Sequence, residues 1–430
     1  ITEGNFYKTD DDFNQGVVAC YAKLKTQMSF HLTEIGYRGD ENVLESMAVS
    51  TQNRYDIDHF AETANNGILN DIWNAWYNGI YRCNDVLDHM TGAKIANYDK
   101  YRGECLFLRS WWYFNLYRVF GVVPITRTVV TPAAAKLIPR CTEEEMYTLL
   151  TEDLAEAARL LPPTPGPEKA RVANIAAYTL LAKIYLTFGK PAEAKTALEE
   201  AMKNTSYGLE STTKKVFDVG NKMNREIIFA LYYNKANDTG HGYWYSTTKP
   251  EEAQLTQPAP VSRALYDARD NRLPLISEYT EDKKGTYLLN KWFDNRNDAL
   301  KGNVVENDFP HLRYADVVLM YAEALAESGS SLGDALVWLN KTRTRAGLDA
   351  LKAEDIPSKG AFIEALADER GREFALEGHR WFDLVRLGLA LDRFHEMGYK
   401  LDAHNLLFPI PQNQIEIVND KTILWQNPGY

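Results

Sequence analysis

Two stretches of the chain repeat one pattern of small and apolar residues that is typical of paired antiparallel helices. LAKIYLTFGKPAEAKTALEEAM runs from Leu181 to Met202, and YAEALAESGSSLGDALVWLNKT runs from Tyr321 to Thr342. In each stretch an alanine-containing apolar helix leads through a glycine turn into a second helix. Alanine lets the two helices approach closely and glycine permits the reversal, but one pair alone leaves an apolar face uncovered. Several such pairs must therefore stack, and we expect a mostly α-helical protein.

Helical periodicity extends beyond these two stretches. Apolar residues at three- and four-residue spacing mark one face of a helix, and the Thr-x-x-Glu pattern that begins at Thr142 is a capping box for a helix start. A short helix after Gly378 is expected to carry Trp381 and Leu384 on one face. The longer predicted helices cover 11–25, 69–90, 98–120, 142–161 and 361–377.

Between the helical blocks the periodicity is lost, and polar sequence with embedded aromatic residues replaces it. Long irregular segments are uncommon inside a helical protein unless they bind something. Because no stretch rich in Gly, Ser or Pro separates domains, we predict a single unit over 1–430, a tetratricopeptide-like superhelix of helix pairs with an irregular, loop-rich half. The helical scaffold is predicted at 69–120, 142–204 and 311–390, the irregular ligand-binding half at 28–68 and 205–310, and a C-terminal segment at 391–430.

Composition excludes several classes of partner. The net charge of −11 leaves no broad basic surface for nucleic acid or anionic lipid. The chain has no run of about 18 apolar residues, which a membrane-spanning helix requires. The cysteines form no C-x-x-C pair, so they indicate neither a zinc ribbon nor a thioredoxin-type motif. We therefore expect no nucleic-acid partner, no metal site and no cofactor. The four cysteines are Cys20, Cys83, Cys105 and Cys141.

Motifs for catalysis are weak. The segment Gly329–Gly333 matches G-x-S-x-G, but a helix leads into it, whereas a nucleophile elbow requires a strand there. His395 is followed by glutamate without completing the H-E-x-x-H zinc motif. Glycoside hydrolysis requires a pair of carboxylates, for which Asp56 and Asp58, or Glu251 and Glu252, could nominally serve, but neighbouring acidic residues in loops are usually solvated. We therefore expect a protein that is not an enzyme.

Aromatic residues in the irregular segments are the best candidates for ligand contacts. Tyr243, Trp244 and Tyr245 stand in a polar, glycine-containing loop, where full exposure would hydrate a large apolar area. Two interpretations remain open: the rings anchor the loop, or they form a platform on which a sugar ring or a peptide side chain stacks. The segment 36–55 offers a similar mixture of aromatic and polar groups. The predicted ligand-binding residues are Tyr243, Trp244, Tyr245, Trp292, Tyr37, Arg38, Asp40, Asn42, Asn53 and Tyr55.

The stretch EGHRWFDLVRLG, from Glu377 to Gly388, is dense in ionisable groups and raises the question of an active site. Glu373 and Glu377 are one helical turn apart, and Arg380 and Asp383 stand at i, i+3, so these charges are expected to pair locally. A planar guanidinium suits such pairing because it binds a carboxylate and several carbonyls at once. We therefore predict a structural role for this stretch rather than a catalytic one.

The longer segment ERGREFALEGHRWFDLVRLG (369–388) resembles the hallmark of the SusD/RagB family. Further segments resemble family blocks in the same order, among them WYNGIYRCNDVL, HLRYADVVLMYAEALAESG and the ending LLFPIPQNQIEIVNDKTILWQNPGY. The resemblance covers essentially the whole chain. It implies four tetratricopeptide-like helix pairs packed against a loop-rich half.

The same resemblance implies an outward-facing lipoprotein of the outer membrane of Bacteroidetes-type bacteria. Such proteins capture nutrients, usually oligosaccharides, and close over a TonB-dependent, SusC-like transporter. The chain begins without an initiator Met, so a processed form is expected, with the lipid-modified cysteine of the anchor upstream of Ile1.

We therefore expect a non-catalytic surface protein that binds glycans, with three alternatives. A peptide-binding member of the same family is one. A helical glycoside hydrolase is another, and it requires two carboxylates roughly 5 to 10 Å apart in a cleft. A pure tetratricopeptide scaffold is the third, and it would bind protein partners through a concave helical groove.

Overall fold

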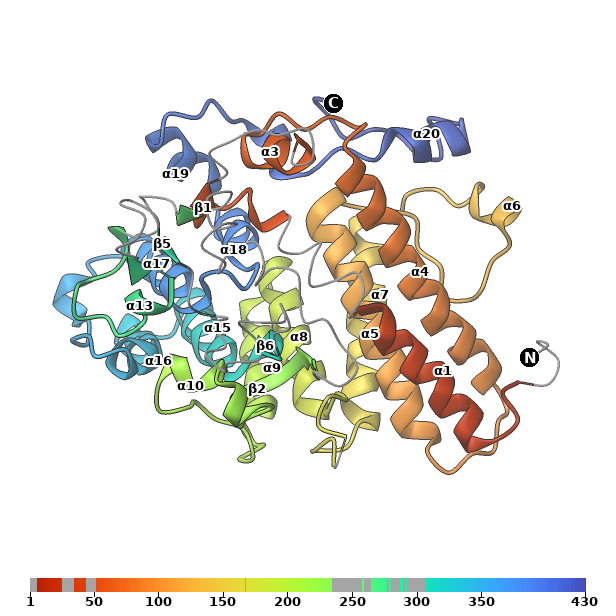
Figure 1. The fold of residues 1–430 in the computed structure, drawn as a ribbon, viewed down its shortest axis with the longest axis horizontal. Coiled ribbons are helices and arrows are strands. Elements are labelled where there is room, and N and C mark those ends of the chain that lie inside the picture. Colours follow the sequence, from red (N-terminus) through yellow and green to blue (C-terminus); the bar gives the residue numbers. More distant parts are fainter. Residues whose placement is uncertain are drawn as a thin grey trace. The chain divides into compact units, whose positions relative to one another are not determined.

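The fold is dominated by helices, in agreement with the predicted mostly α-helical class (Figure 1). The chain divides into two compact units. Unit 1 comprises Ile1–Met28, Glu62–Ile184 and Asp402–Tyr430, and unit 2 comprises Ser29–Ala61 and Tyr185–Leu401. The single unit expected over residues 1–430 stays a prediction. The computed structural model describes residues 6–24, 35–43, 52–166, 168–233, 257–258, 264–276, 278–279, 287–288, 291 and 306–430.

Unit 1 is built around long helices. The helix α5 packs against both α4 and α7, and α1 packs against α4 and α5 (Figure 1). As its aromatic sequence predicts, α5 is buried on most sides, and Trp112 on α5 and Trp76 on α4 have no exposed surface. The helices of this unit are α1 (Asp10–Lys23), α4 (Gly67–Met90), α5 (Tyr98–Phe120), α6 (Pro132–Ala135), α7 (Glu143–Leu160), η7 (Ala403–Leu406) and α20 (Gln412–Val418).

Capping residues set the ends of these helices. The predicted capping box of α7 is confirmed: the Thr142 hydroxyl accepts the Glu145 N–H at 3.1 Å, and the Glu145 carboxylate accepts the Thr142 N–H at 2.7 Å. These contacts satisfy amides that have no partner within the helix. Gly121, in the left-handed region at φ 73°, ends α5.

Unit 2 contains the second of the repeated helix pairs. The helix α15 packs against α9, α16 and α17, and apolar side chains such as Leu319, Leu336 and Phe362 form the buried core between them. The predicted pair of α15 with α16 is confirmed by this packing, and the other predicted stretch forms two helices, α8 and α9, on either side of the turn at Gly189. The helices are α8 (Asn174–Thr187, which begins in unit 1), α9 (Pro191–Met202), α15 (Tyr314–Glu327), α16 (Leu332–Arg345), α17 (Lys359–Phe374), α18 (Arg380–Arg386) and α19 (Ala390–Glu396).

The G-x-S-x-G segment forms the turn between α15 and α16, as predicted. Gly329 has the left-handed φ of 86° that releases the chain from α15. The Ser331 hydroxyl caps α16 by accepting the Asp334 N–H at 3.1 Å. A helix cap of this kind leaves no role for the serine as a nucleophile on an elbow.

Short strands and helices occupy parts of unit 2 that were expected to be irregular. The expectation of an irregular segment over 28–68 is wrong in detail, since its described part contains the strand β1 and the helix α3. Among the described residues, three antiparallel strand pairs form, β1 with β3, β2 with β6 and β4 with β5. The elements are β1 (Asn42–Val43), α3 (Gln52–Asp58), α10 (Thr213–Val216), η4 (Val219–Asn221), β2 (Ile227–Leu231), β3 (Gln257–Pro258), α13 (Leu273–Ile276), β4 (Glu278–Tyr279), β5 (Tyr287–Leu288), β6 (Phe309–Arg313) and η6 (Ala353–Asp355).

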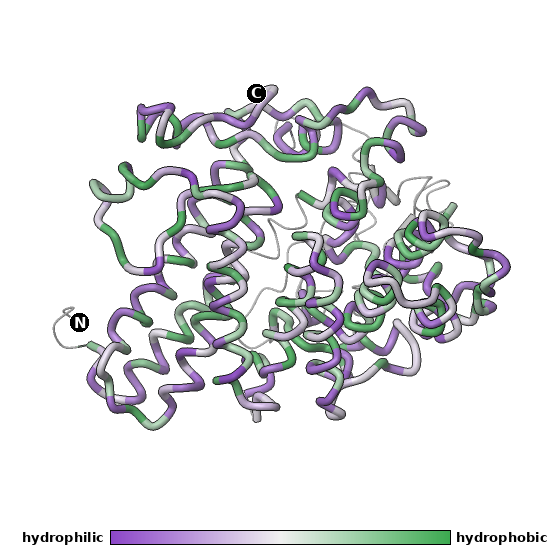
Figure 2. The backbone as a smooth tube through the Cα atoms, turned by 180° about the vertical axis from the view of Figure 1, so that it is seen from behind, coloured by the Kyte–Doolittle hydropathy of each residue, from purple (hydrophilic) through white to green (hydrophobic). Residues whose placement is uncertain are grey.

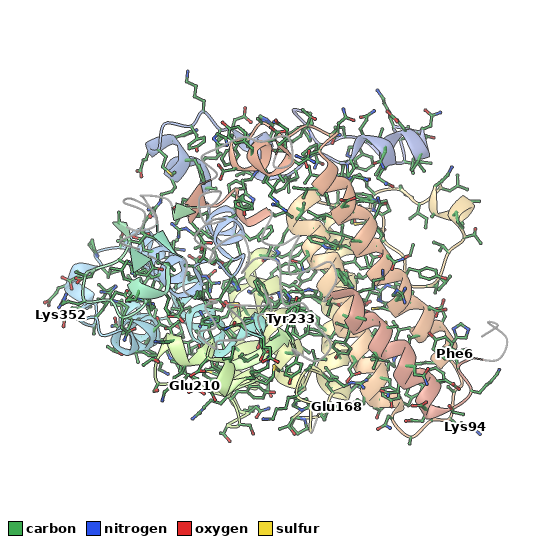
Figure 3. The ribbon with its side chains drawn as sticks, in the orientation of Figure 1. Phe6, Lys94, Glu168, Glu210, Tyr233 and Lys352 are labelled. Atoms are coloured by element: carbon green, nitrogen blue, oxygen red, sulfur yellow. The ribbon has the colours of Figure 1, made fainter. Side chains whose placement is uncertain are left out.

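Helices such as α4 and α7 are amphipathic. Hydrophilic and hydrophobic residues alternate along the backbone trace in Figure 2. Charged side chains such as Lys94, Glu168 and Lys352 are exposed (Figure 3). In the part of the chain that the structure describes, no helix combines the length and apolar composition that crossing a bilayer requires.

Candidate functional site

The family-like signature segment forms the junction between α17 and α18. The predicted helix 361–377 ends earlier, at Phe374. Leu376 (φ 65°) and Gly378 (φ 75°) then take left-handed backbone conformations that turn the chain into α18. A left-handed conformation is uncommon for a side chain such as leucine. The Leu376 N–H is held by the Glu41 carboxylate at 3.1 Å.

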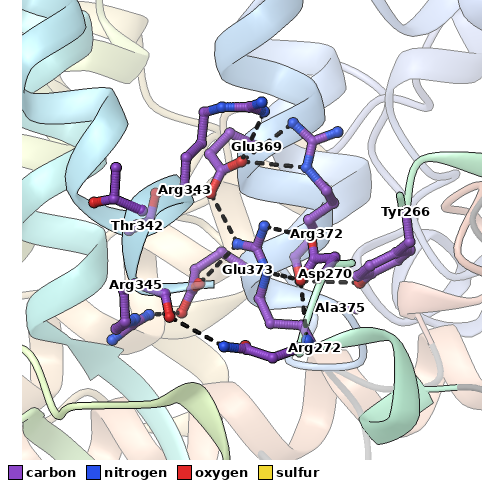
Figure 4. Close-up of polar contacts among 12 residues, drawn as sticks. Tyr266, Asp270, Arg272, Thr342, Arg343, Arg345, Glu369, Arg372, Glu373 and Ala375 are labelled. Carbon is purple, nitrogen blue, oxygen red and sulfur yellow. Dashed lines mark hydrogen bonds and ion pairs between the residues drawn. The ribbon is translucent and has the colours of Figure 1, made fainter. Parts of the chain in front are cut away.

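A network of buried ion pairs surrounds this junction (Figure 4). Arg313, at the end of β6, donates to Glu373 at 2.6 Å and to Glu377 at 2.8 Å, and Arg272 donates to Glu373 at 3.0 Å. These side chains are at most 1% exposed. Burial by itself would raise the pKa of Glu373, but Arg345, Arg313 and Arg272 outweigh it and hold that pKa well below its ordinary value.

The expected local pairing in the signature is wrong in its partners. Arg380 binds Asp40 through two hydrogen bonds of 2.5 and 2.8 Å, and Asp40 lies 340 positions away in the sequence. Asp383 instead accepts from Arg370 at 2.8 Å and from Arg386 at 3.1 Å. Burial opposes ionisation of Asp383, yet these two arginines lower its pKa to about 2. The charged groups of this stretch thus pair with other charged side chains of the protein, as expected of residues with a structural role.

Three of the predicted ligand-binding residues lie in the interior of unit 2. Tyr37 is 4% exposed, Arg38 is fully buried, and Asp40 is 2% exposed. The Arg38 guanidinium lies over the rings of Phe60 and Trp381, at 5.0 and 5.3 Å from their centroids. Arg38 and Asp40 therefore hold the segment 35–43 in place and offer little surface to a ligand, so their ligand-binding role stays a prediction.

Two other predicted residues lie on α3. Asn53 is exposed, and the half-buried Tyr55 stacks on His59 with ring centroids 3.8 Å apart. Asn42 lies in β1, where it is paired with Pro258. These three residues come from different parts of the segment, and their ligand contacts stay predictions.

The aromatic candidates Tyr243, Trp244, Tyr245 and Trp292 lie outside the described residues. Of the residues directly next to them, Lys291 is described. Lys291, next to Trp292, is 3% exposed and donates to the Glu377 carboxylate and the Ala375 carbonyl, each at 2.6 Å. Sequence reasoning missed Lys291 because a single lysine in polar sequence gives no local sign of burial.

Sequence reasoning also missed a cavity of about 390 Å³ in unit 1. Trp73, Tyr77 and Tyr81 on α4 line one side of it, and Ile417 on α20 lines another. The four-residue spacing of these aromatics is a signal that the sequence contains. The Tyr77 hydroxyl is already engaged, since it donates to the Pro124 carbonyl at 2.7 Å.

The described residues give little support to catalysis. Asp56 accepts a hydrogen bond from Gln52 at 2.6 Å, and Asp58, 6% exposed, lies 3.2 Å from His59. Each carboxylate of this neighbouring pair is thus engaged with another side chain. Within the described ranges, no three His, Cys, Asp or Glu side chains gather in a way that would hold a metal ion.

Comparisons with known proteins agree with one another on the family. Residues 271–430 match the sequence profile of the SusD family, and residues 11–186 match a family described as starch-binding associating with outer membrane. SusD-like protein P2 of Formosa agariphila is 26% identical over 99% of this chain and 94% of its own length.

Solved structures agree with this assignment. A laminarin-binding SusD-like protein superimposes with a TM-score of 0.82 at 24% identity, covering 98% of this chain and 100% of that one. Surface glycan-binding protein A from Bacteroides fluxus superimposes with a TM-score of 0.81 at 22% identity over 100% of both chains. With two profiles matching in chain order and the fold shared throughout, the chain belongs to the SusD/RagB family that its signature segment indicates.

Proposed function

We propose that the protein is a non-catalytic cell-surface protein that captures oligosaccharides. The family profile described as starch-binding and the relatives whose names include laminarin binding and surface glycan binding support this ligand class. A further part of the proposal is delivery of the glycan to a TonB-dependent, SusC-like transporter in the outer membrane, with a lipid anchor upstream of Ile1.

The proposed binding surface is made by the loops that carry Tyr243, Trp244, Tyr245 and Trp292, together with Asn42, Asn53 and Tyr55. Sugar rings would stack on the aromatic faces while amide and hydroxyl groups bind their polar edges. The observation that supports this most is the pairing of β1 with β3, at Asn42 with Pro258 and Val43 with Gln257. This pairing joins the segment of Asn42 to the chain that follows the Tyr243–Tyr245 loop.

Direct binding to a panel of soluble starch, laminarin and other oligosaccharides, with a parallel panel of peptides, tests the proposed ligand class. We expect saturable binding of at least one glycan, no binding of peptides, and no release of shorter sugars after long incubation. Individual protein-sugar contacts are weak, so the panel should extend to millimolar concentrations.

Two results would contradict the proposal in different ways. Binding of peptides without any glycan would favour a peptide-binding member of the family. Turnover of the bound glycan would instead establish the helical glycoside hydrolase.

A further inference from the structure

The cavity of about 390 Å³ in unit 1 has a floor of aromatic rings. Trp73, Tyr77 and Tyr81 follow one another at four-residue intervals on α4, so they share one face and rise by about 6 Å per step. Core rings pack behind the first two, with centroid distances of 5.3 Å from Phe120 to Trp73 and 6.4 Å from Tyr113 to Tyr77. These two rings are therefore held in place, and Tyr81, which is 47% exposed, extends the row towards solvent.

The segment 124–140, which includes α6, forms another wall of the cavity beside α4 (Figure 1). Near its start the Asn84 amide donates to the Thr126 carbonyl at 3.2 Å, which ties the segment to α4. At its end the Arg140 N–H donates to the Ile423 carbonyl at 3.1 Å. Because the wall is tied at both ends, it is preformed, and a ligand does not have to order it on binding.

The amide side chains around the cavity are already engaged with the protein. Besides its donated bonds, Asn84 accepts from Arg109 at 2.9 Å, and Gln414 on α20 donates to Asn74 on α4 at 3.1 Å. A sugar here would leave many of its hydroxyl groups without partners, which is costly. The cavity therefore fits an apolar ligand better than a glycan. The apolar part of the lining includes Pro124, Val130, Pro132, Ile138, Ile417 and Leu424.

The size and the floor of the cavity favour a flat ligand. An apolar cavity of about 150 Å³ is large enough for one benzene ring, so a volume of about 390 Å³ has room for about two fused rings. Aromatic rings prefer offset or edge-to-face arrangements with centroids about 4.5–7 Å apart. The Trp73 and Tyr77 centroids are themselves 5.0 Å apart, so a fused-ring ligand can contact both at once.

The rim of the cavity carries a positive charge at Lys136. This lysine is exposed, and no ion pair joins it to another residue in the part of the chain that the structure describes. Asp420 lines a neighbouring hollow together with Lys136, and its carboxylate accepts from the Thr422 N–H and hydroxyl at 2.8 and 2.7 Å. Lys136 is therefore available to pair with an anionic group of a ligand at the rim.

We propose that this cavity is a second ligand site, which binds a fused aromatic ring system carrying a carboxylate or sulfonate group. The rings would lie against Trp73, Tyr77 and Tyr81, and the anionic group would lie towards Lys136. The inference does not depend on the proposed glycan binding, because the cavity contains none of the residues proposed for that surface.

Fluorescence titration of the full chain tests the site with two probes, the anion anilinonaphthalene sulfonate and the neutral N-phenylnaphthylamine. The wild type should bind both saturably, and naphthoate should displace them. Tyr81→Ala should weaken both by about fivefold through loss of one ring contact. Ala135→Trp, which places a large side chain into the cavity, should abolish both. Lys136→Gln should weaken the anionic probe by about threefold at low salt and leave the neutral one unchanged.

Leu137→Ala is the matched control. Leu137 is an apolar side chain of the same segment that is 71% exposed, but it lines the neighbouring hollow and not this cavity. Its affinity for both probes should equal that of the wild type. Circular dichroism confirms that each titrated variant is folded, and Tyr81 and Ala135 are both exposed, so their replacement leaves the core in place.

Four results would overturn the inference. The first is no saturable binding of either probe to the wild type, and the second is wild-type affinity in both Tyr81→Ala and Ala135→Trp. An equal loss in Leu137→Ala would show that the probes bind the outer surface of the segment. Displacement of the probes by laminarin or soluble starch would show that the cavity takes glycans instead.

Discussion

Replacing Asp383 by alanine removes a buried carboxylate from between two arginines. The Asp383 side chain accepts from Arg370 at 2.8 Å and from Arg386 at 3.1 Å and is only 8% exposed. Its pKa of about 2 lies almost two units below the ordinary 3.8. At about 1.4 kcal/mol per unit, this shift corresponds to roughly 2 kcal/mol of stabilisation. Removing one partner of a buried ion pair typically lowers the free energy of unfolding by about 3–5 kcal/mol, which is of the same order as this 2 kcal/mol.

The two arginines keep other partners after the change, which limits the expected loss. Arg370 is still 2.9 Å from Asp316, and Arg386 still donates to Glu323. We therefore expect Asp383→Ala to lower the free energy of unfolding by about 2 to 3 kcal/mol at pH 7. Urea unfolding followed by circular dichroism measures this, with Val337→Ala, on an exposed side chain, as the control.

The pH dependence gives a second measure of the same pair. Because the pKa of Asp383 is lowered in the folded protein, its contribution is complete above about pH 4 and is lost as the pH falls through about 2. The difference in stability between wild type and Asp383→Ala should shrink over that window. A difference below about 0.5 kcal/mol at pH 7 would refute the argument, since that is the range of ordinary surface substitutions.

Two further changes test the packing of the same structure. Burial raises the pKa of Glu41 to about 8, so the contribution of Glu41 to stability should fall by on the order of 1.4 kcal/mol per pH unit as the pH rises from about 4.5 to 8. Urea unfolding across that range should show this as a change in the stability difference between the wild type and Glu41→Gln, which keeps the neighbours Asp40 and Arg380. An added Cβ at Gly79 would lie 2.2 Å from the Trp112 ring, so Gly79→Ala should cost at least about 1–3 kcal/mol and lower the Tm, whereas an unchanged Tm would mean that α4 and α5 are not packed this closely.

The helices could be predicted from the sequence because their signals are local. The helix predicted over 98–120 coincides with α5. The helix predicted over 69–90 starts two residues later than α4 does. Amphipathic spacing, capping residues and turn glycines each act within a few positions, so they remain readable without tertiary information. The helices on either side of Gly189 and of Gly329 could be predicted from the same local signals.

The partners of the buried charges could not be predicted because they are distant in the sequence. Arg380 meets Asp40 and Lys291 meets Glu377 only after the chain has folded, and nothing near either residue specifies its partner. The rule for i, i+3 pairs suggested Asp383 as the partner of Arg380, but a fully buried guanidinium is held by the carboxylate that packing brings to it. The mixture of polar and aromatic residues in 36–55 likewise did not distinguish the buried Arg38 from the exposed Asn53.

The proposed function depends most directly on the segments of Trp244 and Trp292 as the glycan-binding surface. Equilibrium titration of the wild type, the double variant Trp244→Ala/Trp292→Ala and Trp425→Ala with the glycan that the wild type binds tests this claim. Trp425 is a matched control because it is a tryptophan of unit 1 that is 40% exposed. Stacking energies of about 0.5–1.5 kcal/mol per ring predict at least about a fivefold loss of affinity in the double variant and none in Trp425→Ala. Equal affinity of the double variant and the wild type would contradict the account.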